Sequence, residues 1–326
     1  MRAYVLPLLL LLEVAVLAPV SGIRFDSLAA FTTSFGYYAS DLIAQAAPLL
    51  VLVFGMTVVL MTAGIDLSVG SAVALVACVM STFDGGPAFW MTAVPIGLAM
   101  GLATGLFNGG LIAKLDVPPI IATLGTLFFY RGLCEAVMRG QERGPFYDVP
   151  GYEWFGGLTG SLCTAGIVLL AGGWWFGRSR WRREVLMLGG NRVAARYAGI
   201  PVERRTLQVY GLMGVLVFVA ALCHTARNGS VTASSLVGLE LQVIVAAVLG
   251  GTRVSGGAGS LSGSVIGVLL VAVLNEGLRS AGMHWGERLP FEIRHLEFIL
   301  LGGLLVVGVW LNTHAERLPG LSRKVS

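Results

Sequence analysis

The chain has 326 residues, of which 56% are hydrophobic and 12% charged, and its net charge is +4. Soluble domains carry about 25% charged residues, so this composition excludes an ordinary water-soluble protein, and the small charge does not favour nucleic-acid binding. Apolar stretches of about 16–25 residues recur along the chain, the length that crosses a hydrocarbon core of about 30 Å. We therefore expect one polytopic, all-α membrane domain over residues 1–326.

Ten apolar segments define the expected transmembrane bundle, and the third and eighth are short. The first could be mistaken for a cleaved signal peptide, because Arg2 precedes its apolar run, but Glu13 within the run favours a retained helix. Forty-five glycines favour closely packed and interrupted helices. The segments lie at about 5–20, 43–62, 68–82, 89–113, 119–138, 159–177, 206–226, 239–250, 260–280 and 295–312.

The first break between apolar segments reads Thr62-Ala-Gly-Ile-Asp-Leu-Ser-Val-Gly-Ser71 and places Asp66 in a very hydrophobic stretch. A carboxylate there costs about 2.5–3.5 kcal/mol on insertion scales, so it needs a partner or a wet cavity. Asp66 and Ser68 either cap the next helix through its free N–H groups or contact a polar substrate. We assign Asp66, Ser68 and Ser71 to a candidate translocation pathway.

Polar residues in the next two segments extend this pathway. Asn108 lies near the end of the fourth segment, and the prolines of Val117-Pro-Pro cannot continue a helix, so a re-entrant segment is expected there. Thr123 and Thr126 are spaced i and i+3 on one helix face. Their hydroxyls either face a polar substrate or bond to their own backbone carbonyls.

The second half of the chain repeats the theme of polar groups beside glycine-rich breaks. Ser68-Val-Gly-Ser71 and Leu261-Ser-Gly-Ser264 match at an offset of 193, and each precedes an apolar run, which indicates a weak internal two-fold repeat. Breaks at corresponding places in two halves predict discontinuous helices that line a transport pathway. Asn275, in an Asn-Glu-Gly triplet, completes the candidate pathway residues.

The segment 178–205 carries the largest charge asymmetry in the chain, with eight arginines against Glu184 and Glu203. By the positive-inside rule this loop is cytoplasmic, and with six apolar segments before it and four after it both termini are expected to face the cytoplasm. Within the loop, residues 189–200 predict a short amphiphilic helix that ends at Gly199 and Pro201. The arginines are Arg178, Arg180, Arg182, Arg183, Arg192, Arg196, Arg204 and Arg205.

Neither a metal site nor catalytic residues are expected from the sequence. The four cysteines have no C-x-x-C spacing, and the four histidines are scattered. The only two lysines, Lys114 and Lys324, follow no glycine-rich phosphate-binding loop. The chain is therefore not expected to hydrolyse ATP by itself.

Four motifs, in this order over about residues 5–312, resemble the permease subunits of ribose-type bacterial ABC importers. The third motif combines Gly189-Gly-Asn191 with Ala194-Ala195 and Gly199-Ile200. The others are Gly64-Ile-Asp-Leu-Ser-Val-Gly-Ser71, Val117-Pro-Pro with Ile121-Ala-Thr-Leu-Gly-Thr126 and Arg131-Gly132, and Val248-Leu-Gly-Gly-Thr252 with Ser255-Gly-Gly257.

This resemblance implies a non-enzymatic subunit of the bacterial inner membrane that moves a monosaccharide by alternating access. The implied partners are a second permease chain, an ABC ATPase that binds ATP and Mg, and a periplasmic sugar-binding protein, besides membrane lipid; this chain itself would hold no cofactor. Arg192 and Val193 stand where the family commonly has an acidic residue before the paired alanines, which implies a matched ATPase. The implied coupling-helix residues are Gly189, Asn191, Arg192, Ala194, Ala195, Arg196 and Gly199.

Alternative functions remain open at the level of sequence. Related permeases carry branched-chain amino acids, nucleosides or a furanosyl signalling compound. A proton-coupled secondary transporter could use Asp66, since the broken helices alone permit it. A non-transporting scaffold would leave Asp66 and the two glycine breaks without a purpose.

Overall fold

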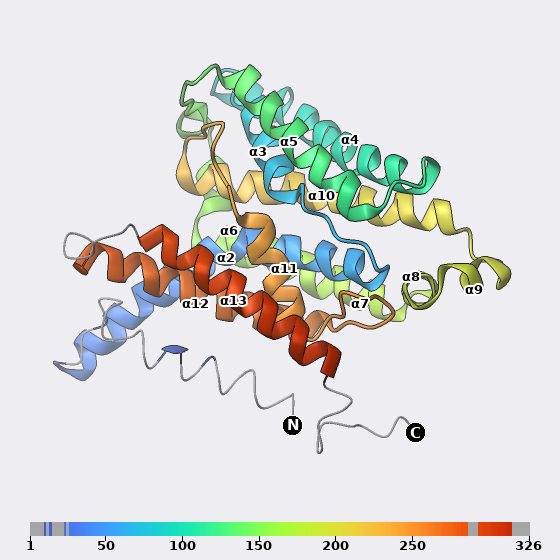
Figure 1. The fold of residues 1–326 in the computed structure, drawn as a ribbon. Helices are drawn as coiled ribbons and strands as arrows, with labels where there is room; N and C mark the ends of the chain where they lie inside the picture. Colours follow the sequence, from blue (N-terminus) through green and yellow to red (C-terminus); the bar gives the residue numbers. More distant parts are fainter. Residues whose placement is uncertain (1–9, 11–12, 15–22, 24–25, 286–292, 315–326) are drawn as a thin grey trace.

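The computed structural model describes residues 26–285 and 293–314, with a few positions nearer the N-terminus (Figure 1). Over these residues the chain is helical, and the one extended pairing is an isolated antiparallel bridge between Arg143 and Val231. The expected all-α membrane architecture is therefore confirmed. The apolar segment at about 5–20 lies outside the described residues.

Six helical stretches are long and apolar enough to cross a membrane. One of them, Leu158–Arg178, contains a π-helical turn between two α-helical parts, and such single turns occur within α-helices without ending them. The six are α2 (Leu28–Met61), η2 (Pro87–Trp90) with α4 (Ala93–Lys114), α5 (Pro119–Met138), α6 (Leu158–Gly166) with η5 (Ile167–Gly172) and α7 (Gly173–Arg178), α10 (Val202–Asn228), and α12 (Leu261–Trp285).

Shorter helices complete the described part of the chain. α3 (Val69–Met80) has 12 residues and α11 (Leu239–Leu249) has 11, so each is under about 20 Å long and cannot cross the hydrocarbon core alone. Eleven of the 12 residues of α3 and seven of the 11 residues of α11 are buried. The remaining elements are η3 (Pro145–Asp148), η4 (Tyr152–Gly156), α8 (Arg180–Gly190), α9 (Arg192–Tyr197) and α13 (Ile293–His314).

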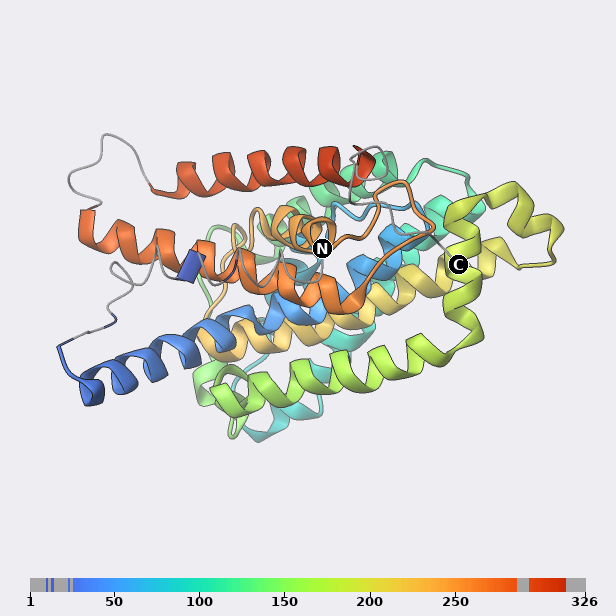
Figure 2. The same ribbon diagram turned by 90° about the horizontal axis from the view of Figure 1, so that it is seen from below.

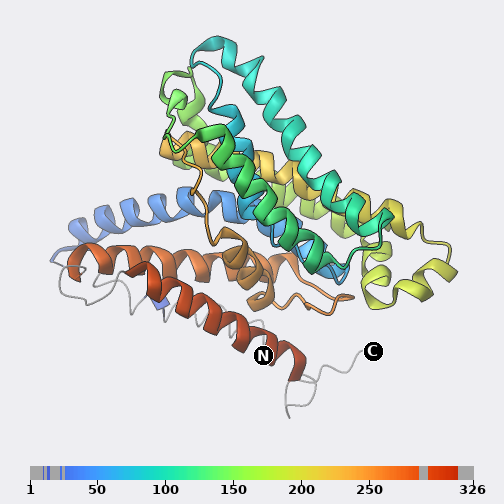
Figure 3. The same cartoon turned by 45° about the horizontal axis from the view of Figure 1, so that its top comes forward.

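Helix α2 is the centre of the bundle and packs against α10, α12, α6 and α11. In its most apolar window 83% of the residues are buried, against 17% in Leu158–Arg178, which is therefore peripheral. Seen from below, α13 and Leu158–Arg178 form opposite margins, with α2 and α10 between them (Figure 2). α4 and α5 lie next to each other, on the side of the bundle away from α12 and α13 (Figure 3).

The contact between α4 and α10 is made by main-chain atoms at glycines. A Cβ added to Gly105 would meet the carbonyl oxygen of Tyr210, and one added to Gly214 would meet the carbonyl oxygen of Gly101. Small residues let transmembrane helices approach this closely, and dispersion then replaces the hydrophobic driving force that lipid cannot supply. The glycine content of the sequence therefore has a packing role here.

The proline pair separates α4 from α5, at the helix boundary that the sequence predicted. α4 ends at Lys114 and α5 begins at Pro119, the first helical position at which a missing N–H costs nothing. α5 then runs for 20 residues as a candidate span, which matches the apolar segment expected at about 119–138. The internal two-fold repeat stays a prediction.

Candidate functional site

The break between α2 and α3 is held by a chain of buried side-chain hydrogen bonds that starts at Asp66. Its Oδ1 accepts from the backbone N–H of Ser68 at 2.9 Å and from the Ser68 hydroxyl at 2.7 Å. Asn108, on α4, donates from Nδ2 to Ser68 Oγ at 2.8 Å. Ser68 is the residue that precedes α3, and its side chain makes no cap bond to the first turn. The carboxylate thus fixes the turn that leads into α3.

The predicted pathway hydroxyls in this region bond to backbone carbonyls. Thr123 Oγ1, on α5, donates to Pro119 O at 2.8 Å and to Ile65 O at 3.0 Å. Thr126 donates to Thr123 O at 3.2 Å, and Ser71 donates to Ser68 O at 2.8 Å. All are buried. These bonds tie the α2–α3 break to α5.

Two tyrosines that sequence reasoning missed complete this cluster. The Tyr130 hydroxyl donates to Thr104 O at 3.0 Å and lies 3.4 Å from Asn108 Oδ1. Tyr210 is buried beside Gly64, and among the described residues its hydroxyl has no hydrogen-bond partner. Both lie in long apolar helices that contain other aromatic residues, so nothing in the local sequence distinguishes them from core residues.

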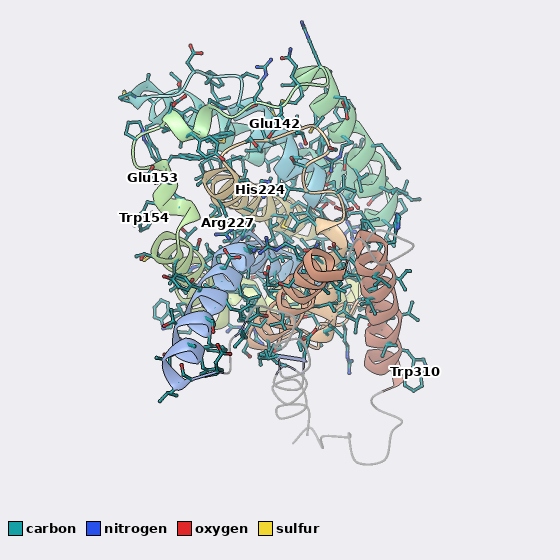
Figure 4. All side chains as sticks on the ribbon, turned by 90° about the vertical axis from the view of Figure 1, so that its left-hand side faces the viewer. Glu142, Glu153, Trp154, His224, Arg227 and Trp310 are labelled. Carbon is teal, nitrogen blue, oxygen red and sulfur yellow. The ribbon has the colours of Figure 1, made fainter. Side chains whose placement is uncertain are left out.

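A second polar cluster lies at the end of the bundle opposite α8 and α9, and sequence reasoning did not identify it. Asp41, on α2, forms ion pairs with Arg227 of α10 and with Arg279 of α12, the latter at 3.2 Å. Arg279 also pairs with Glu276 at 2.8 Å, and Gln45 donates to Asp41 at 2.7 Å. Figure 4 looks onto this end and shows Arg227 and His224 near its middle.

Asn275 belongs to this second cluster and not to the Asp66 cluster. It lies on α12 beside Glu276 and lines a cavity together with Gln45, His224 and Arg279. The structure therefore divides the predicted pathway residues into two groups. Six of them surround the α2–α3 break, and Asn275 stands apart in the other half of the bundle.

The predicted coupling segment is two helices with a sharp break between them. α8 ends at Gly190, and Asn191 caps α9 by accepting from the backbone N–H groups of Val193 at 3.0 Å and Ala194 at 2.9 Å. α9 is followed by Gly199, whose φ of +79° is in the left-handed region that favours glycine. This corrects the expectation of one helix over residues 189–200.

The α8–α9 segment has its own small core and projects from one end of the bundle (Figure 1). Ala195 is buried with Leu188, Ile200 and Val202. Glu184 of α8 forms an ion pair with Arg205 of α10, which braces the segment against the bundle. The other predicted residues, Asn191, Arg192, Ala194, Arg196 and Gly199, are exposed.

Gly189, another of the predicted coupling residues, faces the main bundle. A Cβ at this position would meet the carbonyl oxygen of Met61, at the end of α2, and the backbone nitrogen of Gly257. Gly257 donates to Met61 O at 3.0 Å. Main-chain atoms of α2, α8 and the glycine-rich loop 250–260 thus meet at one point, which we call the three-way junction.

Together these features define a polytopic membrane protein with interrupted interior helices and a basic helical segment exposed at one end. The sequence matches the family described as the branched-chain amino acid transport system permease component over residues 38–309. The chain belongs to this family of transport permeases.

Curated relatives place the chain among import permeases. It is 35% identical over 250 residues to the ribose import permease protein RbsC of Escherichia coli strain K12, covering 74% of this chain and 78% of the relative. It is 35% identical over 283 residues to the autoinducer 2 import system permease protein LsrD of Klebsiella pneumoniae, covering 80% of each. The galactose/methyl galactoside import permease protein MglC of Salmonella typhimurium is 29% identical over 296 residues, covering 84% of this chain and 85% of the relative. No solved structure matches the chain.

Proposed function

We propose that this chain is the membrane-spanning permease subunit of an ATP-driven importer that carries a monosaccharide across the bacterial inner membrane. The observation that carries the proposal is the exposed α8–α9 segment. Because this segment has its own small core and projects from the bundle, it offers a separate ATPase a surface to bind. The sugar is inferred from relatives that are named for ribose, galactose and fructose import.

The proposed assembly has two copies of the permease or two related permease chains, an ABC ATPase on the α8–α9 side, and a periplasmic sugar-binding protein on the other side. ATP and Mg bind the ATPase, and the permease moves the sugar by alternating access. In this arrangement the α8–α9 segment and both termini face the cytoplasm. The arginine excess in residues 178–205 supports this orientation.

Reconstitution tests the function directly. The permease, its ATPase and its binding protein are placed in proteoliposomes, and uptake of labelled ribose, galactose, fructose and leucine is measured with ATP, without ATP, and with a proton gradient in place of ATP. We expect ATP-dependent uptake of one of these sugars. Uptake of leucine instead would favour the branched-chain amino acid function for which the family is described. Uptake driven by a proton gradient without ATP would contradict the proposal.

Orientation has its own test. With Arg192→Cys, we expect a membrane-impermeant maleimide to label the permease in inverted membrane vesicles and not in intact spheroplasts, because residue 192 is exposed on the α8–α9 side. Cys163, also exposed, supplies a background that the unaltered chain measures. Labelling of residue 192 in spheroplasts would reverse the proposed topology.

A further inference from the structure

The peripheral span Leu158–Arg178 ends in a group of aromatic and basic side chains. Its 21 residues cover about 31 Å, close to the hydrocarbon thickness of about 30 Å. Near its end Trp174 and Trp175 are 62% and 52% exposed, and the Arg178 guanidinium lies 4.9 Å from the centre of the Trp174 ring. Exposed tryptophans of this kind are enriched where hydrocarbon meets the lipid head groups. The end of this span therefore lies at that boundary.

Helix α8 leaves the end of this span at a steep angle and crosses the end of the bundle (Figure 2). Its first residue, Arg180, follows the peripheral span after a single extended residue. Gly189, near its other end, lies against Met61 at the end of the central helix α2. α8 thus runs from the margin of the bundle to its centre, along the surface of the membrane. Its first turn is the part closest to lipid.

Aromatic packing fixes the first turn of α8 relative to the bundle. The ring of Trp181 lies 5.6 Å from that of Trp175 and 5.6 Å, edge to face, from that of Phe176. Phe176 is buried and packs edge to face against Phe54 of α2 at 6.2 Å. The bend between α7 and α8, which we call the elbow, is therefore held in place from the centre of the bundle.

The elbow carries positive charge that the protein itself does not neutralise. Residues 174–183 contain four arginines and no acidic residue. Arg178, Arg180 and Arg183 are exposed, and among the described residues none of the three forms an ion pair. Glu184, the next carboxylate along the chain, is already paired with α10. We call Arg178, Arg180 and Arg183 the elbow arginines.

We propose that the elbow arginines bind the phosphates of anionic phospholipids, whose acyl chains lie along the exposed tryptophans at the end of the span. A guanidinium matches a phosphate group with two parallel hydrogen bonds and stays charged at every physiological pH. Basic residues beside a transmembrane span attract anionic lipid, and each one near the surface strengthens binding about fivefold. The inference concerns the membrane, and it does not depend on the solute or on the ATPase.

The position of the elbow favours lipid over an acidic surface of the ATPase. The elbow lies at the margin of the bundle, and Leu170, one turn before Trp174 on the same span, is 76% exposed. α9 instead projects furthest from the bundle, and its arginines, Arg192 and Arg196, are exposed there (Figure 1). The basic surface is thereby divided, with the start of α8 beside lipid and α9 available to a soluble partner.

Quenching of tryptophan fluorescence by brominated lipid tests the site on the full-length permease. The permease is placed in phosphatidylcholine vesicles in which a small part of the lipid is brominated phosphatidylglycerol or, in parallel, brominated phosphatidylcholine. Bromine on the acyl chains quenches tryptophan only on contact, so stronger quenching by the anionic lipid measures preferential binding. We expect this preference in the unaltered permease.

Two triple variants show whether the preference belongs to the elbow. Replacing the elbow arginines should weaken the preference about fivefold for each arginine, in a variant that combines Arg178→Gln, Arg180→Gln and Arg183→Gln. The matched control removes the same charge from exposed positions in α9 and at the start of α10, and should keep the preference. It combines Arg192→Gln, Arg196→Gln and Arg204→Gln.

Three results would overturn the inference. Equal quenching by the two brominated lipids in the unaltered permease would show no preference. An equal loss in both triple variants would mean that lipid responds to total charge and not to the elbow. If the elbow variant keeps its lipid preference but no longer copurifies with the ATPase, the elbow arginines bind an acidic surface of that subunit. If the triple variant does not fold, Arg183→Gln with Arg204→Gln as its control gives the same comparison, with an expected fivefold difference.

Discussion

Asn108 donates a hydrogen bond of 2.8 Å to the hydroxyl of Ser68, although 40 residues separate them in sequence. The Ser68 hydroxyl in turn donates to Asp66. A side chain of α4 thereby positions the carboxylate that shapes the turn before α3. A residue outside the turn therefore helps to fix its conformation. Removal of the side chain of Asp66, Ser68 or Asn108 should loosen the N-terminal end of α3.

The first prediction concerns Asp66. Asp66→Ala removes the acceptor of two buried hydrogen bonds and should lower the free energy of unfolding by about 1–3 kcal/mol, seen as a lower melting temperature in detergent. Asp66→Asn keeps an amide oxygen in the same place and should lose less. If Asp66→Ala melts like the unaltered permease but transports slowly, the carboxylate belongs to the pathway and its structural role here is wrong.

The second prediction concerns the contact between α4 and α10. Gly105→Val should cost about 1–3 kcal/mol or prevent folding, because its side chain would meet the main chain of α10 at Tyr210. Gly110→Val is the control, since it lies on the same helix with open space around its Cα. Monodisperse yield after detergent extraction measures both. Equal yields would mean that α4 and α10 are further apart than described.

A third prediction tests the three-way junction. Gly189→Ala should push α8 away from Met61 and from the loop at Gly257, and should reduce ATP hydrolysis stimulated by the binding protein. Gly190→Ala makes the same change one residue along, where nothing lies within 4 Å, and should have no effect. The two ATPase rates measured side by side decide the point. Identical rates would show that the junction does not transmit motion.

The fourth prediction concerns the surface that the ATPase is proposed to bind. Gly199→Arg should leave the permease folded but abolish sugar-stimulated ATP hydrolysis, because a long side chain would stand between α9 and its partner. Gly199→Ala carries the same backbone strain at a φ of +79°, a cost of about 1–2 kcal/mol, without the bulk. Normal hydrolysis by Gly199→Arg would remove residues 189–200 from the contact, whereas equal losses in both variants would attribute the effect to strain.

The sequence was sufficient to place the apolar helices because each is an apolar run, although α2 begins 15 residues before the segment predicted at about 43–62. Nine of the ten predicted segments fall within the described residues, and each corresponds to an apolar helix. Pro118 and Pro119 mark a helix boundary, as the sequence predicted, but such a boundary occurs equally well between two full spans and before a re-entrant segment. Length after the boundary decides between them, and α5 continues for 20 residues.

The site was harder to predict because its members meet only in three dimensions. Asp41, Arg227 and Arg279 lie on three helices, and each looks alone like a charge near a membrane surface. Asn275 was singled out for its triplet, but its buried and unpaired oxygen could not be foreseen. Conversely, the motif around Asp66 was easy to notice because Asp66, Ser68 and Ser71 lie close together in the sequence. Their closeness also explains why Asp66 and Ser71 both form hydrogen bonds with Ser68.

The length of α2 has a consequence for any soluble protein that approaches the permease. At 1.5 Å per residue its 34 residues span about 51 Å, well beyond a hydrocarbon core of about 30 Å. The largely buried part from Ala44 to Met61 accounts for about 27 Å of this. In the earlier turns Leu28 and Tyr37 are exposed, so this part of α2 extends beyond the packed interior of the bundle. A helix of this length either tilts in the hydrocarbon core or projects from it, and in both cases its first turns give a soluble protein a surface beside the bundle.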